Sequence, residues 1–237
     1  MLVKRTLKQL SIKGLFLPVI ALCSLLVVAE PSEAAPVPVT FSFTGAVSEV
    51  TGVLFNPMGT SLGTGLMTGS VTFDTAANQI FPGTGVYLNS ITGLTLTIPK
   101  TVMMIPNTYT ASYASGGNNG IVIGNSNPDG GTDQFTAISG MAGATINGPS
   151  PSSFSMSLID PSGNVFNNLN LPTTPPSLNS FASGQWRLVF GNEIDGNIVK
   201  GSFSNLTAVP LPAAVVLFGV GLTALVGLGA GGLRYLR

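Results

Sequence analysis

The sequence predicts an all-β protein, a single antiparallel β-sandwich of jelly-roll type with about eight to eleven strands. Apolar and polar residues alternate in short runs, Thr and aromatic residues are frequent in those runs, and turn residues separate them. Outside the two ends of the chain, no window keeps the 3.6-residue period of an amphipathic helix. Disorder is the alternative, because Gly, Pro and Ser are abundant, but repeated apolar faces argue against it. We therefore expect one folded domain over residues 35–208.

Five runs show the alternation. In the first, residues 39–47, Val39, Phe41 and Phe43 share one face and Ser and Thr occupy the other. Each such run predicts a strand with one buried face. The other four are 67–74 (Val71, Phe73), 91–99 (Leu94, Leu96, Ile98), 153–160 (Phe154, Met156, Leu158) and 185–191 (Trp186, Leu188, Phe190).

The last two predicted strands form a hairpin. Residues 186–190 are followed by a polar turn containing Asp195-Gly196, and the chain returns as 198–206. Gly93 and Gly201 interrupt strand patterns and indicate bulges. Residues 171–181 contain several prolines, which cannot join a central strand, so we expect an irregular connection there.

Charge and composition exclude several classes of function. Between residues 35 and 208 there are three basic and seven acidic side chains, a net charge of −4, which disfavours nucleic acid as a partner. The chain has no His, and its single Cys is Cys23. Zinc sites of the Cys/His type, His-dependent catalytic triads and an intrachain disulfide are therefore excluded. No cofactor is expected.

Residues 1–34 have the pattern of a secretory signal peptide. A basic start is followed by a long apolar run and by small residues before the predicted cleavage between Ala34 and Ala35. A lipoprotein signal at Cys23 is disfavoured, because Leu22 occupies a position that needs a small residue. An uncleaved N-terminal anchor is the remaining alternative. The central region is therefore expected to be exported through the Sec machinery and signal peptidase.

The C-terminal end predicts a transmembrane helix. Residues 213–233 contain no charge over 21 residues, and roughly 31 Å of helix is long enough to cross a hydrocarbon core. Arg234 and Arg237 follow it and favour the cytoplasmic side of the inner membrane. The expected orientation is therefore N-out and C-in.

A short motif at the start of this span distinguishes the C-terminal end from an ordinary transmembrane helix. The hexapeptide VPLPAA, the apolar span, the Arg-containing end and the signal peptide together resemble the PEP-CTERM sorting signal, over residues 209–237. The namesake pattern has Glu where Leu211 stands, and Tyr235-Leu236 separates the two arginines. The motif residues are Val209, Pro210, Leu211, Pro212, Ala213 and Ala214.

This resemblance implies a route rather than an activity. Proteins with this tail are exported by Gram-negative bacteria and processed by exosortase, a membrane-embedded cysteine peptidase, and they are associated with exopolysaccharide and biofilm. By the same resemblance, Val209, Pro210 and Pro212 are the recognition residues, and Arg234 and Arg237 are the basic stop.

Two local motifs in the central region suggest sites. Residues 59–63 match G-x-S-x-G, but the nucleophile elbow needs a helix and a His base, so chance explains the match. Oxygen-bearing side chains spaced as in a calcium loop form the one metal candidate. Its position 12 is Thr rather than Glu, and a simple type I turn is the alternative. The candidate ligands are Asn125, Asn127, Asp129 and Asp133.

The aromatic residues raise the question of glycan binding. Trp186, Tyr87, Tyr109 and Tyr113 could form a sugar-stacking platform on one face. However, Trp186 alternates in phase with Leu188 and Phe190, which indicates a core residue.

The expected function is that of a non-enzymatic cell-surface or extracellular-matrix protein. It would be held in the inner membrane by its C-terminal helix and then processed by exosortase. A carbohydrate-binding module that tethers exopolysaccharide is the alternative. An enzyme is a third hypothesis, because two of the seven acids could converge for carboxylate catalysis although no motif pairs them.

Overall fold

The computed structural model describes residues 38–56, 58–116, 119–126 and 131–209, and within them the fold is all-β, as predicted. These residues form eleven strands and three short 3-10 turns, without an α-helix. The strands are β1 (Pro38–Val50), β2 (Thr60–Leu62), β3 (Gly65–Asp74), β4 (Val86–Leu88), β5 (Ile91–Val102), β6 (Ile105–Tyr113), β7 (Gly120–Gly124), β8 (Asp133–Gly143), β9 (Pro151–Asp160), β10 (Ser183–Phe190) and β11 (Ile198–Ala208). The 3-10 turns are η2 (Gly52–Leu54), η3 (Leu178–Ser180) and η4 (Glu193–Asp195).

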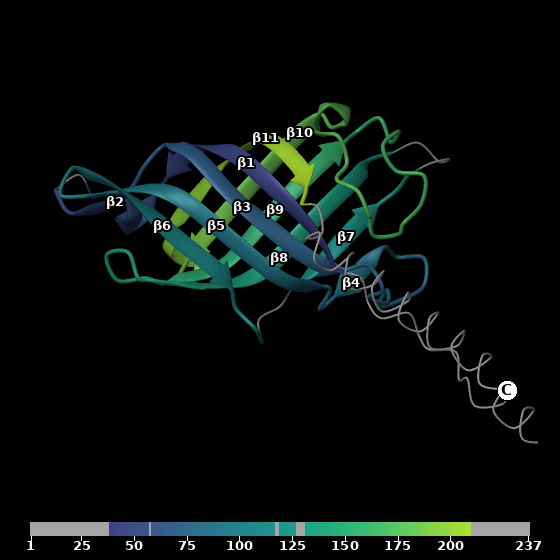
Figure 1. Ribbon diagram of the computed structural model, residues 1–237, viewed down its shortest axis with the longest axis horizontal. Helices are drawn as coiled ribbons and strands as arrows, with labels where there is room; N and C mark the ends of the chain where they lie inside the picture. Colours follow the sequence, from purple (N-terminus) through teal and green to yellow (C-terminus); the bar gives the residue numbers. More distant parts are fainter. Residues whose placement is uncertain (1–37, 57, 117–118, 127–130, 210–237) are drawn as a thin grey trace, which may run out of the picture. The chain divides into compact units, whose positions relative to one another are not determined.

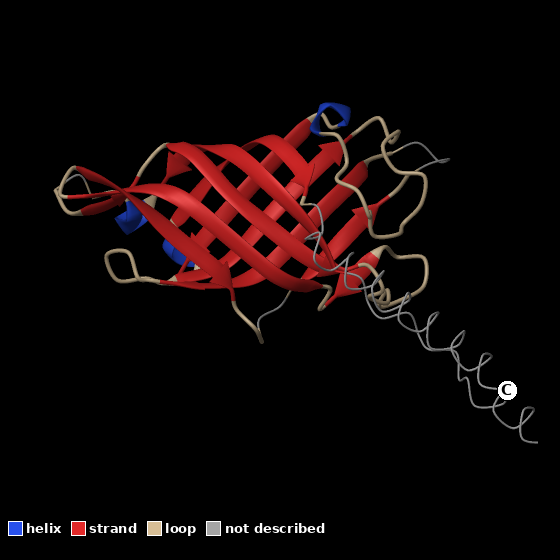
Figure 2. Cartoon of the chain, in the orientation of Figure 1, coloured by secondary structure: helices blue, strands red, loops and turns tan. Residues whose placement is uncertain are grey.

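The predicted jelly-roll-type β-sandwich is wrong, because eight of the strands close into an antiparallel barrel (Figures 1 and 2). The ring runs β1, β3, β5, β6, β8, β9, β10 and β11, and β11 pairs again with β1. Each of these strands lies beside the ring strands that precede and follow it in the chain, so the topology is up-and-down rather than Greek key.

The alternation of apolar and polar residues could not predict that the strands close into a barrel. A sandwich and a barrel both bury one face of each strand, so alternation alone does not distinguish them. What distinguishes them is β6, which pairs with β5 along its length and then with β8 through Ala111–Tyr113 and residues 141–143. This pairing satisfies the backbone N–H and C=O groups that a sandwich would leave at its edges.

Irregular register accompanies the bending of the long strands. The pairing of β1 with β11 shifts twice, beside Gly45 and opposite Gly201, and the pairing of β3 with β5 shifts beside Gly93. Bulges increase local twist, which helps a sheet to coil into a barrel. The two bulge positions expected from Gly93 and Gly201 are therefore confirmed.

Three short strands extend the barrel wall. β2 adds to the far end of β5, while β7 pairs with the first part of β8 and β4 pairs with β7. β4 and β7 thus continue the β8 edge where β6 does not cover it (Figure 1).

The interior of the barrel is filled by side chains, as expected for eight strands. The apolar face predicted for each run is the face that the structure buries, and Trp186, predicted as a core residue, is 1% exposed. Its indole Nε1 has no hydrogen-bond partner in the described part of the chain. The largest fully buried side chains include Trp186, Tyr109, Phe41, Phe43, Phe73, Phe135, Phe154 and Phe190.

The two ends of the described chain lie together. Phe41 of β1 pairs with Ala208 of β11, and the Val209 N–H donates to the Thr40 carbonyl at 2.9 Å. We call this the terminal end of the barrel, and the opposite end, with turns 51–59, 103–104 and 191–197, the distal end. Every strand pair of the barrel lies within residues 38–208, so the fragment 36–209 contains all the partners it needs to fold alone.

The predicted hairpin and connection are also confirmed. β10 and β11 pair across η4, where Gly196 takes a left-handed conformation with φ of 69°. Residues 171–181 form no strand and contain only η3. Among the described residues, no helix has the length and apolar character needed to cross a membrane. The predicted signal peptide, 1–34, and transmembrane helix, 213–233, lie outside the described residues.

Candidate functional site

Most residues of the predicted sorting route lie outside the described part of the chain. Of the sorting motif the structure describes Val209, which is partly exposed and directly follows β11. The others, for which the prediction stands as made, are Ala34, Ala35, Pro210, Leu211, Pro212, Ala213, Ala214, Arg234 and Arg237.

The proposed sugar-stacking platform does not form. Trp186, Tyr87 and Tyr109 lie in the barrel core, each less than 5% exposed. The Tyr109 hydroxyl donates to the Ala144 carbonyl at 2.8 Å, and burial raises the pKa of Tyr109 to about 12. The Tyr87 hydroxyl donates to the Leu169 carbonyl, also at 2.8 Å. Tyr113 is partly buried and accepts a hydrogen bond from the Asn119 amide. These aromatic rings therefore pack and orient loops rather than face a ligand.

Asp133, one of the four calcium candidates, is a completely buried carboxylate at the start of β8. Its Oδ2 accepts hydrogen bonds from the backbone N–H groups of Val165 and Phe166, both at 2.7 Å, and Oδ1 accepts from the Ser126 N–H at 3.1 Å. Both oxygens thus face N–H donors, an arrangement that ties the loop after β9 to the start of β8. Asn127 and Asp129 lie outside the described residues, which contain no group of three or more metal-ligating acids, His or Cys.

Asp160, at the end of β9, lies opposite Asp133 in the β8–β9 register. Its carboxylate accepts hydrogen bonds from the Ser162 hydroxyl at 2.6 Å and from the Ser162 and Asn164 N–H groups. The hydrogen bonds from Ser162 hold the pKa of Asp160 below its ordinary value. Asp133 and Asp160 therefore do lie close together, but the carboxylate of each accepts hydrogen bonds from groups of the protein itself. The sequence signal for this role was Asp-Pro-Ser-Gly-Asn, an Asx-turn pattern.

Ser61 of the G-x-S-x-G match lies in β2 and is 4% exposed. Its hydroxyl donates to the Leu62 carbonyl at 3.2 Å. The position is part of a strand rather than a strand-to-helix elbow, which agrees with the interpretation of this motif as chance.

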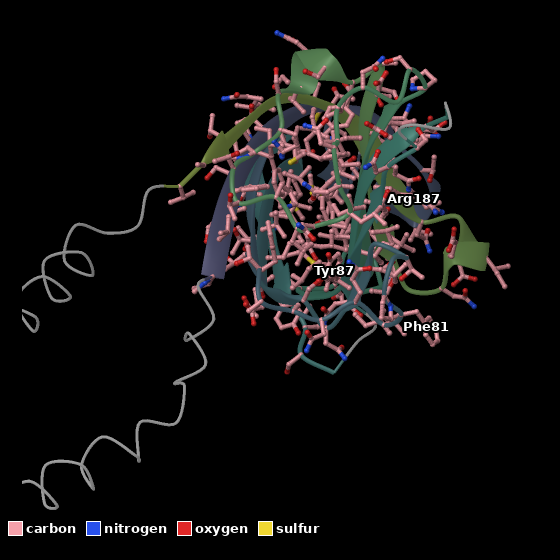
Figure 3. The ribbon with its side chains drawn as sticks, turned by 90° about the vertical axis from the view of Figure 1, so that its right-hand side faces the viewer. Phe81, Tyr87 and Arg187 are labelled. Carbon is pink, nitrogen blue, oxygen red and sulfur yellow. The ribbon has the colours of Figure 1, made fainter. Side chains whose placement is uncertain are left out.

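A polar groove on the outer face of β9, β10 and β11 is the best candidate for a functional site. It has a volume of ≈ 390 Å³, and two of the three basic residues predicted for the exported region lie in it. Arg187 of β10 and Lys200 of β11 are direct cross-strand partners, and Figure 3 shows Arg187 on the outside of the barrel. Ser155, Ser157, Gln185 and Ser202 supply further hydrogen-bonding groups along the groove.

The charges in this groove are balanced at its rim. Arg187 pairs with Glu193 of η4 at 2.6 Å, and Lys200 pairs with Glu49 of β1 at 2.9 Å. Like charges directly opposite each other on a sheet are unfavourable, so the two glutamates offset a local repulsion. Both ion pairs are partly exposed, and exposed pairs contribute little stability, so a ligand carboxylate or hydroxyl could replace either glutamate at small cost.

Sequence reasoning did not identify this groove, although a signal was present. In the predicted hairpin Arg187 alternates out of phase with Trp186 and Leu188, which places it on the outer face. What the sequence lacked was the register that brings Lys200 opposite Arg187.

Hydroxyl groups form cross-strand pairs over much of the remaining outer face. Such hydrogen bonds stabilise neighbouring strands while keeping the surface uncharged. The pairs are Thr40–Thr72 at 2.9 Å, Ser70–Thr95 at 2.8 Å, Thr44–Ser204 at 3.0 Å and Thr136–Ser157 at 3.1 Å.

Comparison of the chain with protein-family models, with curated proteins and with solved structures found no significant match. The fold and this surface define a closed, up-and-down β-barrel with a hydroxyl-rich exterior and one basic-polar groove.

Proposed function

We propose that the protein is an exported, non-enzymatic component of the cell surface or extracellular matrix. In this proposal it is held in the inner membrane by residues 213–233, processed by exosortase at the motif 209–214, and contributes to exopolysaccharide or biofilm. The observation that carries the proposal is the place where the barrel ends. β11 ends at Ala208, and the VPLPAA motif begins at the next residue.

This boundary supports a cut that leaves the domain intact. The last described backbone hydrogen bond is donated by the Val209 N–H to Thr40, so cleavage after Val209 would break no strand pairing. The chain enters β1 and leaves β11 at the same, terminal end of the barrel. A signal peptide and a membrane-anchored tail attached there would both be removable without touching the core.

The outer surface also suits a hydrated polymer matrix. It bears few charges and many paired hydroxyl groups, so it can exchange hydrogen bonds with water and sugars without strong electrostatic attraction or repulsion. The buried acids Asp133 and Asp160, which are the nearest approach to a catalytic carboxylate pair, are engaged in holding loops.

The sorting proposal predicts a specific change when the motif is altered. Pro210→Ala/Pro212→Ala is expected to leave the protein unprocessed in the membrane fraction of the producing bacterium, as deletion of the exosortase would. Immunoblotting of the cell and medium fractions compares the sizes and amounts. Pro82→Ala, in an exposed loop of the barrel, is the matched control and should be processed normally. Mature protein of unchanged size in the medium of the deletion strain would contradict the proposal.

A second candidate function, tethering of exopolysaccharide, is favoured by the groove around Arg187 and Lys200. A guanidinium and an ammonium group beside Gln and Ser side chains fit the carboxylate and hydroxyl groups of an acidic polysaccharide. Affinity electrophoresis of fragment 36–209 through the producer's own polysaccharide tests this function.

Arg187→Gln/Lys200→Gln is expected to abolish retardation of the fragment in the polysaccharide gel, because it removes both cations and keeps the polar surface. The matched control is Lys100→Gln, which removes the remaining basic residue of the exported region from another strand, β5, and should leave retardation unchanged. Equal retardation of wild type and the double variant would exclude this groove as the binding site.

A further inference from the structure

The distal end of the barrel carries an exposed apolar projection, which we call the distal knob. It consists of Phe55 and Met58 from the loop after η2 and of Met103, Met104 and Ile105 from the β5–β6 turn. These side chains are between 61% and 91% exposed. The two loops lie side by side, because the Met103 N–H donates to the Gly59 carbonyl at 2.9 Å, and in Figure 1 they project at the left, beyond β2.

The backbone of the knob is unusual for its sequence. Met103 and Met104 form a two-residue hairpin turn between paired Val102 and Ile105, and both have positive φ, 48° and 68°. This turn type strongly favours Asn-Gly, since Asn and Gly tolerate the left-handed region, in which other residues with a Cβ, such as Met, are strained. Two large apolar side chains are thus held in water at strained positions. Strain and exposure together point to a binding role, for which the flexible thioether of Met is well suited.

A complementary surface exists on the same chain. An apolar groove of ≈ 440 Å³ runs over the outer face of β4, β7 and β8, a volume within the range of about 300–1,000 Å³ seen for binding pockets. We call it the flap groove. Its apolar side chains are Val86, Leu88, Val122 and Ile138, of which Leu88 and Ile138 are 55% and 44% exposed. No charged residue lines it, and none belongs to the knob.

The knob and the groove cannot meet within one molecule. β7 pairs with Gln134–Ile138, the first half of β8, and β4 pairs with the other edge of β7. Because β8 begins at the terminal end of the barrel, the groove lies toward that end, whereas the knob lies at the distal end. Two uncharged apolar surfaces at opposite ends of one chain, one projecting and one hollowed, can contact each other only between copies.

We propose that the distal knob of one molecule docks into the flap groove of a second copy, so that the barrels associate head to tail. Because the two surfaces differ, the contact is heterologous and does not close on itself, which produces linear chains of barrels. The occupant of the groove is therefore the Met103-Met104 turn of another copy, flanked by Phe55 and Met58. Two loops seated in one groove make a small interface, so each contact is weak and chain length depends on concentration.

The test uses fragment 36–209 and two double variants. Met103→Asn/Met104→Gly removes the knob while supplying the residues that the turn prefers, so its melting temperature is expected to be unchanged or higher. Leu88→Thr/Ile138→Thr makes the groove polar with residues suited to exposed strand positions. Sedimentation velocity from about 10 µM to about 1 mM covers the range in which weak interfaces form.

The expected result has three parts. Wild type forms concentration-dependent chains, each variant alone remains monomeric, and a mixture of the two variants forms dimers only. Dimers form in the mixture because the knob variant keeps its groove and the groove variant keeps its knob. Neither knob-to-knob pairing nor non-specific aggregation predicts this complementation.

Cysteine cross-linking provides an independent readout, since the only Cys of the chain, Cys23, lies outside the fragment. Met104→Cys mixed with Ile138→Cys is expected to give a disulfide-linked dimer under mild oxidation, and Met104→Cys mixed with Thr110→Cys, on the outer face of β6, should not.

Each of the following outcomes would overturn the proposal: a wild-type monomer over the whole concentration range, self-association of either variant alone, or a mixture that stays monomeric. A fragment that is monomeric in solution but floats with phosphatidylcholine vesicles through its Met103-Met104 turn would show that the knob serves a lipid surface instead.

Discussion

Gly201→Ala is expected to destabilise the barrel by about 3–5 kcal/mol, a large part of the roughly 5–15 kcal/mol that holds a typical domain folded. Gly201 lies in β11 where the pairing with β1 changes register. A Cβ at this position would overlap the carbonyl oxygen of Ala46 and lie 3.0 Å from Cε2 of Trp186. The overlap is with backbone, so no side-chain rotation relieves it, and the β1–β11 pairing must open.

The measurement is urea unfolding of fragment 36–209, followed by the fluorescence of Trp186, the only Trp of the chain. Gly93→Ala is the matched control, because Gly93 also lies in a strand beside a bulge. There a Cβ would meet its nearest neighbour, Thr72 Cβ, at an ordinary 3.5 Å. The control should change the free energy of unfolding by less than about 1 kcal/mol. Equal unfolding midpoints for the two variants would show that Gly201 is not needed for closure.

Asp133→Ala is expected to cost about 2–4 kcal/mol, because it removes the acceptor for the N–H groups of Val165, Phe166 and Ser126. The loss of stability is expected to affect the loop after β9 first. The loop after β9 is tied to β8 by this carboxylate, so the variant should become sensitive to proteolysis within residues 161–170 before the barrel unfolds.

Two comparisons sharpen the Asp133 prediction. Asp133→Asn keeps one oxygen for Val165 and Phe166 but directs an amide donor toward the Ser126 N–H, so an intermediate loss of stability is expected. Asp195→Ala removes an exposed acid from η4 and should change stability by less than about 0.5 kcal/mol. If Asp133→Ala matched Asp195→Ala in both stability and protease sensitivity, the loop would be held by other contacts.

Gly201 and Asp133 stabilise different parts of the fold, the barrel wall and a loop. Gly201 matters because two strands far apart in sequence must approach closely at a bend, which is a condition of barrel closure. Asp133 matters because a loop without strand structure needs acceptors for its backbone N–H groups. Neither role gives the residue a part in catalysis.

Much of the local structure could be predicted. Period-2 alternation identified the strands around Phe41, Phe73, Leu96 and Phe154 and the core position of Trp186, because successive side chains of a strand point to opposite faces whatever the strand pairs with. The β10–β11 hairpin followed from Asp195-Gly196. By contrast, the turn at Met103-Met104 carries none of the residues that usually mark a hairpin, so its apolar tip was not foreseen.

The candidate binding surfaces could not be predicted as well from the sequence. The prediction of an aromatic platform was wrong because Tyr87 and Tyr109 are buried and their hydroxyls donate hydrogen bonds to loop carbonyls. The basic pair of Arg187 and Lys200 depends on the register of two strands. Binding surfaces of this kind combine residues from several strands, whereas a motif search finds residues that are close in the chain.

By itself, the sequence determined the all-β class, the inward face of the main strands, and the expectation of a signal peptide and a sorting tail, since all of these depend on neighbouring residues. Tertiary structure alone decided that the strands close into a barrel, that Asp133 and Asp160 hold loops, and that an apolar knob and groove lie toward opposite ends. The physical reason is that closure rests on pairing β6 with β8 and β1 with β11. Such pairing depends on accumulated twist, bulges and register over many residues, and alternation within one strand contains none of that information.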